Sequence, residues 1–184
     1  TNYSIGPANQ YADFFPYLDR VWFGEWFRYN KMTPDEWLVQ FSGIPFGVMS
    51  EMLQDGGNRW LGMVYGATTR FYNSDETAPG PIWKYWDAVD IGNKKMYGYW
   101  NEDCPVKCDN ENVKVTAYAG KDTLLLAIGN FSDTLQQARL SLTGEWKSWE
   151  GQLQMEAPAI ERYQAAQTFT AGQPITVPPK KGWL

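Results

Sequence analysis

The chain has 184 residues, a formal net charge of −5 and no histidine, and its sequence pI is about 4.8. Such an acidic chain has no basic stripe to neutralise phosphates, which argues against nucleic acid as a partner. The absence of histidine excludes Ser-His-Asp and Cys-His catalysis and every metal site with histidine ligands. Carboxylate, lysine and tyrosine chemistry remain for proton transfer.

Length and composition narrow the class further. The chain is long enough for one ample domain or two small ones, and no run of about 18 apolar residues predicts a membrane span. Thr1 in place of an initiator Met predicts a processed or excised chain. Ten Trp and eleven Tyr are unusually many. Aromatic faces stack on sugar rings, so this content is typical of carbohydrate-handling proteins; core packing is the alternative for each ring.

Residues 1–16 are predicted to be an irregular lead-in, and Tyr17–Phe27 a buried strand that ends in Glu25. Loops beyond the carboxyl ends of strands form the sites of α/β enzymes, so Glu25 is the first candidate for a catalytic acid or base. The structural alternative is an ion pair of Glu25 with Arg20, Arg28 or Arg59.

A helix is predicted to begin at Thr33, which suits the N-cap position, with Pro34 in the first turn and Glu36 completing a capping box. Ser42-Gly43 is predicted to end this helix. Residues 44–53 are predicted to form a short buried strand or an irregular turn into a helix, and residues 59–70 and 81–89 two further helices. Residues 96–100 read as a short aromatic strand.

The pattern changes after an acidic loop at 101–112, which we interpret as a domain boundary. Residues 113–119 and 123–130 alternate around a turn and predict a hairpin, and short strands are predicted to follow. The fold class is therefore α/β plus all-β, with an α/β segment at 1–103 and an antiparallel β-sandwich at 110–184. The first segment has too few strands for a (β/α)₈ barrel. It is either a compact α+β unit or the last part of a barrel.

Cys104 and Cys108 flank three residues. A zinc site needs further Cys or His ligands, which the sequence lacks. A short-loop disulfide, which would fit an oxidising compartment, and two free thiols are the two interpretations that remain.

Several residues are candidates for the site itself. Glu51 is the natural catalytic partner of Glu25, with an exposed acid at a helix end as the alternative; two carboxyls about 5 Å apart suit a retaining glycosidase, and about 6.5–9.5 Å an inverting one. Trp146, Trp149 and Trp183 are a second aromatic group, for binding or packing. The candidates for substrate binding are Trp22, Trp26, Arg59, Trp60 and Tyr65, each with a packing or ion-pair role as its alternative.

Several segments resemble the C-terminal part of large bacterial glycoside hydrolases related to glycoside hydrolase family 123. These segments are Val21–Glu25, Trp37–Gly47, Gly62–Gly66, Asp103–Lys107, Ala157–Glu161 and Gly182–Leu184. The resemblance implies the end of a (β/α) barrel followed by a C-terminal β-sandwich, in a secreted or periplasmic protein that processes polysaccharides.

The resemblance also implies an adjacent Asp-Glu pair that assists substrate-assisted hydrolysis of N-acetylhexosaminides. The adjacent acidic pairs of this chain are Asp35-Glu36, Asp75-Glu76 and Glu102-Asp103. Asp35-Glu36 lies in the first turn of a predicted helix and the other two lie in loops, of which only Glu102-Asp103 follows a predicted strand. None of them matches the family's catalytic pair, so no catalytic residue is carried over.

The primary hypothesis is the C-terminal portion of a carbohydrate-active hydrolase that uses Glu25 and Glu51 and no cofactor. Its expected partners are an oligosaccharide or polysaccharide substrate and an N-terminal part of the same polypeptide. One alternative is a non-catalytic carbohydrate-binding or structural module. Another is a scaffold for a site formed by residues outside the chain.

Overall fold

The structure is a computed structural model that describes residues 8–23, 27–44, 47–52, 57–69, 78–150, 154–170 and 172–184. Side chains are described for these residues except 8–12 and 22–23. The chain divides into two compact units, Thr1–Pro79 and Gly80–Leu184. The predicted boundary after residue 103 falls inside the second unit. Among the described residues, the helices are too short or too polar to cross a membrane.

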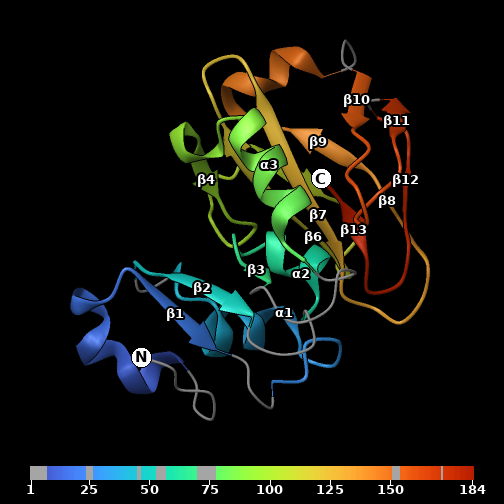
Figure 1. Cartoon of the computed structure of the whole chain (residues 1–184). Helices are drawn as coiled ribbons and strands as arrows, with labels where there is room; N and C mark the ends of the chain where they lie inside the picture. The colour runs from blue at the N-terminus through green and yellow to red at the C-terminus, as the bar shows by residue number, and fades with distance from the viewer. Residues whose placement is uncertain are drawn as a thin grey trace. The chain divides into compact units, whose positions relative to one another are not determined.

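Unit 1 contains a three-stranded parallel sheet in the order β1-β2-β3, with helical segments between the strands (Figure 1). Consecutive strands are neighbours, which is the arrangement produced by repeated β-α-β connections. The elements are η1 (Ala8–Tyr17), β1 (Arg20–Phe23), α1 (Pro34–Glu36), η2 (Trp37–Phe41), β2 (Met49–Met52), α2 (Arg59–Met63) and β3 (Thr68–Thr69).

Local chemistry sets the start of the first helix, as predicted. The Thr33 hydroxyl accepts a hydrogen bond from the Glu36 N–H at 3.3 Å, and the Glu36 carboxylate accepts one from the Thr33 N–H at 2.8 Å. The capping box therefore satisfies two backbone donors that the helix leaves open. A turn of π-helix, Trp37–Phe41, continues it, and Ser42 is its C-cap.

Other elements of unit 1 differ from the sequence-based expectation. Residues 8–17 form a 3₁₀-helix where an irregular segment was predicted, so β1 begins only at Arg20. Residues 49–52 form a strand, which was one of the two alternatives. The predicted helix at 59–70 ends at Met63, and the chain then turns into β3.

Unit 2 is built mainly from short strands, with a four-stranded antiparallel sheet in the order β13-β7-β6-β4. Three two-stranded pairs accompany it: β5-β9, β8-β12 and β10-β11. The elements are α3 (Gly80–Ala88), η4 (Ile91–Asn93), β4 (Lys95–Tyr97), β5 (Val106–Cys108), β6 (Val113–Ala119), β7 (Leu124–Asn130), β8 (Gln136–Ala138), β9 (Leu140–Leu142), η5 (Gly144–Trp149), β10 (Gln154–Ala157), β11 (Gln167–Thr170), β12 (Ile175–Val177) and β13 (Gly182–Trp183).

The core of unit 2 draws on strands of several sheets. Val113, Val115 and Ala117 alternate along β6 and are buried together with Ile175 and Val177 of β12. The predicted hairpin is confirmed, because β6 and β7 pair antiparallel from Val113–Asn130 to Ala119–Leu124. The loop at 101–112 contains the unpredicted strand β5, whose Val106 also lies in this core.

The two cysteines are free thiols. Cys104 is buried, and its Sγ donates to the carbonyl oxygens of Val106 at 3.4 Å and Tyr97 at 3.6 Å. The Sγ of Cys108 donates to the carbonyl oxygen of Asn110 at 3.6 Å. The structure thus corresponds to the free-thiol interpretation, because each sulfur is engaged with a different part of the backbone.

We predict that iodoacetamide labels the native protein slowly at neutral pH. Burial raises the pKa of the Cys108 thiol, so little of the reactive thiolate is present, and Cys104 is fully buried. Mass spectrometry after unfolding without a reductant should find a carbamidomethyl group on both cysteines of the wild-type chain. In Cys108→Ser it should find one such group, on Cys104. Labelling of the unfolded chain only after reduction would show a disulfide instead.

We predict that Gly182→Ala destabilises unit 2. A Cβ at this position would collide with the carbonyl oxygen of Ile128, the residue that pairs with Trp183 of β13. Moving backbone apart in a packed sheet should lower the free energy of unfolding by about 2 kcal/mol or more. Gly92→Ala is the matched control, because a Cβ there meets nothing within 4 Å. Denaturant unfolding that gives equal stabilities for both variants would contradict this packing.

Candidate functional site

The register of the parallel sheet in unit 1 determines which side chains share a face. Trp22 of β1 pairs with Glu51 of β2, which in turn pairs with Thr68 of β3. Side chains alternate along a strand, so Arg20, Glu51 and Thr68 belong to one face of the sheet. Neighbouring Met52 belongs to the other face.

Helix α2 covers the Met52 face. The N–H of Asn58, at the start of α2, donates to the Met52 sulfur at 3.2 Å. A Cβ added at Gly62 within α2 would lie 2.6 Å from the Met52 Cε. Because Glu51 and Met52 are adjacent in the strand, the Glu51 side chain points to the sheet face opposite α2.

Glu51 forms an ion pair on that opposite face. Arg20 Nη1 donates to Glu51 Oε1 at 2.9 Å, and the side chains are 58% and 11% exposed, respectively. A carboxylate as buried as Glu51 is costly unless it is paired and hydrogen-bonded. The Arg20 guanidinium supplies this compensation. The structure therefore places Glu51 in the central strand of a sheet, and not at an exposed helix end.

Glu25 lies outside the described residues, as do Trp26 and the side chain of Trp22. In the sequence Glu25 comes two residues after Phe23, the last residue of β1. Its place relative to Glu51 stays a prediction.

Two of the predicted binding residues lie in the first turn of α2. The Asn58 side chain caps this helix by accepting from the Leu61 N–H at 3.0 Å. Its Nδ2 also donates to Asn30 Oδ1 at 2.7 Å, which ties the segment after β1 to the start of α2. Arg59 Cζ lies 5.0 Å from the ring centroid of Trp60, and both side chains are partly exposed. Arg59 and Trp60 therefore follow the carboxyl end of β2, as a site residue of an α/β fold does.

Tyr65 has a packing environment in this structure. Its ring is fully buried and stacks on Trp37, with the centroids 5.5 Å apart and the planes at 7°. Its hydroxyl donates to the Pro34 carbonyl oxygen at 2.8 Å. Tyr65 joins an aromatic cluster with Phe27, Tyr29, Trp37 and Phe41, so it offers no ring face to a sugar here.

The adjacent acidic pairs do not form a second site in the described part of the chain. The Glu36 carboxylate accepts from the Thr33 N–H and hydroxyl, which hold its pKa below the usual range. This suits a capping residue and not a proton donor. Asp103 lies 3.9 Å from Lys95 Nζ with both side chains mostly exposed. Asp75 and Glu76 lie outside the described residues.

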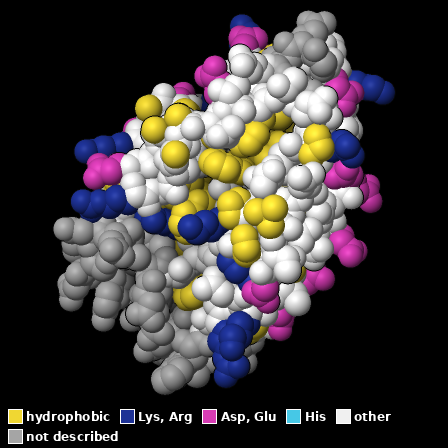
Figure 2. Space-filling view, turned by 90° about the vertical axis from the view of Figure 1, so that its right-hand side faces the viewer, with side chains coloured by type: hydrophobic (Ala, Val, Ile, Leu, Met, Phe, Trp, Pro, Cys, Tyr) yellow, Lys and Arg dark blue, Asp and Glu magenta, His cyan; other side chains and the backbone are white. Residues whose placement is uncertain are grey.

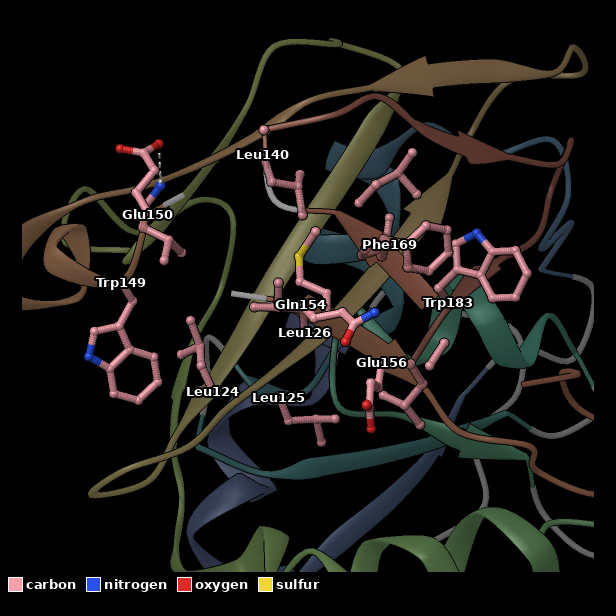
Figure 3. Close-up of a pocket in the computed structure, with 17 residues that line it drawn as sticks. Leu124, Leu125, Leu126, Leu140, Trp149, Glu150, Gln154, Glu156, Phe169 and Trp183 are labelled. Atoms are coloured by element: carbon pink, nitrogen blue, oxygen red, sulfur yellow. Dashed lines mark hydrogen bonds between the residues drawn. The ribbon is translucent and has the colours of Figure 1, made fainter. Parts of the chain in front are cut away.

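Unit 2 has a pocket of about 230 Å³ that is mainly apolar. Hydrophobic side chains gather in a hollow on one face of the molecule (Figure 2), and Figure 3 shows Trp149 at one side of the pocket and Phe169 with Trp183 at the other. Leucines of β7 and β9 line it. Its ionisable lining residues are Glu150, which accepts from the Leu142 N–H at 3.3 Å, and Glu156. This environment suits packing or binding better than acid–base chemistry.

The sequence indicated Glu51 as a candidate but did not indicate Arg20 as its ion-pair partner. From the sequence, Arg20 is a candidate partner of Glu25 only. The available signal was a charged residue in each of two short apolar segments, Arg20–Phe23 and Met49–Met52. Only the register shows that the two charges meet.

Two family models match the chain. Residues 1–72 match the model described as glycoside hydrolase 123, TIM-barrel domain, and residues 78–184 match glycoside hydrolase 123, C-terminal domain. No curated protein and no solved structure matches it. The second model alone covers more than half of the 184 residues, and the two matches follow each other along the chain. The chain therefore belongs to glycoside hydrolase family 123.

Proposed function

We propose that the chain is the C-terminal portion of a hydrolase that cleaves glycosidic bonds by carboxylate chemistry. The observation that carries the proposal is the Arg20–Glu51 ion pair, in which the carboxylate is mostly buried and which lies on the face of a parallel sheet opposite α2. The sheet belongs to the segment that matches a glycoside hydrolase barrel domain. Apolar side chains are enough to pack the inner face of such a sheet. A charged pair on that face therefore favours a chemical role.

Unit 1 would form the end of a (β/α) barrel. Its parallel strands pair in chain order with helices between them, which favours a barrel over a doubly wound sheet, where the strand order reverses. A barrel needs eight strands and about 250 residues, whereas the described part of unit 1 has three strands. The remaining strands would come from another part of the same polypeptide and would pair with the edges β1 and β3.

Unit 2 would form an antiparallel β-sandwich. Support comes from its core, in which residues of the four-stranded sheet pack with residues of β5, β8 and β12 from separate strand pairs. A core shared between sheets in this way is the usual basis of a sandwich. The alternative function is carbohydrate binding without catalysis. The aromatic residues that line the pocket of unit 2 would serve it.

Glu51 and Glu25 would border the scissile bond in different roles. Glu51 is salt-bridged, and an ionised carboxylate accepts hydrogen bonds but donates none. It therefore fits the role of general base or hydroxyl acceptor. Proton donation to the leaving group then needs another carboxyl, for which Glu25 after β1 is the candidate.

The substrate would be an oligosaccharide or polysaccharide, held with the help of Arg59, Trp60 and the tryptophans at 22 and 26. A secreted or periplasmic location would suit this role, because polymeric sugars do not cross membranes unaided.

We predict that Glu25→Gln and Glu51→Gln each lower kcat on aryl glycosides by about 100-fold or more, since a positioned acid or base contributes that much. The assay uses the protein with its complete barrel and a panel of 4-nitrophenyl glycosides, N-acetylhexosaminides included. Asp35→Asn is the matched control, because Asp35 is an exposed acid in the first turn of α1.

Thermal melts of all three variants separate loss of activity from loss of folding. Wild-type turnover in both folded glutamine variants would contradict the catalytic assignment. Binding of sugars by tryptophan fluorescence with no hydrolysis of any glycoside would favour the non-catalytic alternative.

A further inference from the structure

Arg20 approaches Glu51 from the amino-end side of the sheet. Arg20 is the first residue of β1 and pairs with Met49, whereas Glu51 lies two residues further along β2. The guanidinium therefore reaches forward along the strands to contact the carboxylate at 2.9 Å. Sugars would enter a barrel from the carboxyl ends of the strands, so they would approach Glu51 from the side opposite to Arg20.

This contact restricts how the carboxylate can turn. Arg20 takes one of about four lone-pair directions that a carboxylate offers to hydrogen-bond donors. A charge-assisted bond to a planar guanidinium is short and directional. The contact with Arg20 thereby favours one orientation of the Glu51 carboxylate.

The pair also has no net charge. The two opposite charges lie side by side at the sheet face, where Arg20 is more than half exposed and Glu51 is mostly buried. A sugar that enters from the carboxyl ends would meet Glu51 before Arg20, so an anionic sugar would be repelled by the nearer carboxylate. A neutral hydroxyl can donate to the Glu51 carboxylate without contacting Arg20.

We propose that Arg20 is a positioning residue, which orients Glu51 to accept a hydrogen bond from one hydroxyl of a neutral sugar. This inference rests on the proposed function and adds to it the residue that orients Glu51. Arg20 acts through Glu51 and takes no part in the transfer of protons.

The test measures the selectivity of the site for single hydroxyls. N-acetylglucosamine, N-acetylgalactosamine and their monodeoxy analogues serve as competitive inhibitors of aryl glycoside hydrolysis. In wild type, one deoxy position should weaken inhibition most. In Arg20→Gln the parent sugars should inhibit about tenfold more weakly, because a hydrogen bond to a charged group is misdirected, while that one analogue changes less than twofold.

Two variants complete the comparison. Arg20→Lys keeps the charge without the planar fork, so it should retain part of the selectivity, and it provides the same measurement if Arg20→Gln does not fold. Arg139→Gln removes an arginine from an exposed pair with Asp109, 4.0 Å apart in unit 2, and should leave every inhibition constant unchanged.

The outcomes separate the two claims. If both Arg20 variants lose affinity equally for all analogues, Arg20 has only a structural role. If neither variant loses affinity, Arg20 does not position Glu51. Stronger inhibition by a uronic acid than by the neutral sugars would show that the sugar contacts Arg20 directly, which would overturn the positioning role. If wild type binds the sugars but hydrolyses no glycoside, the hydrolase function fails and calorimetric titration of the same sugars still tests Arg20. Absence of binding would overturn both.

Discussion

The parallel register between β1 and β2 is the constraint on which the proposed site depends. This register pairs Trp22 with Glu51. It places Arg20 two positions closer to the amino end, on the face that carries the Glu51 side chain. A slip of one residue would turn Glu51 toward α2 and bring Met52 to the face opposite that helix. Packing opposes such a slip, because Met52 contacts the start of α2 and is almost fully buried. The apolar contacts on one face thereby hold the charged pair on the other.

The two units differ in how their aromatic residues are used. In unit 1 the rings of Trp37, Tyr65 and Phe41 are fully buried and pack against one another, so they stabilise the helical layer. In unit 2, Trp149 and Trp183 line an apolar pocket whose carboxylates are Glu150 and Glu156. High aromatic content alone predicts a sugar-handling protein in both cases. Burial shows that one of these two groups of rings belongs to the core.

The sequence predicted the features that local chemistry controls. The helix start at Thr33 follows from a capping box spanning four residues, and the hairpin at 113–130 from alternation around a turn. The strand β5 was missed because three residues carry too little periodicity. The Arg20–Glu51 contact joins residues 31 positions apart, and only pairing of the strands reveals it. Glu51 was therefore identified as a candidate without its environment, and Glu25 stays a prediction from the sequence.

The central claim is that sugar binds at the carboxyl ends of the parallel sheet against Glu51. A crystal structure of the protein with its complete barrel, soaked with an N-acetylhexosamine, tests this most directly. We expect a sugar hydroxyl within hydrogen-bond distance of a Glu51 carboxylate oxygen, while Arg20 contacts the other side of that carboxylate. A sugar bound only in the pocket between Trp149 and Trp183 of unit 2, with the Arg20–Glu51 pair enclosed by other side chains, would contradict it.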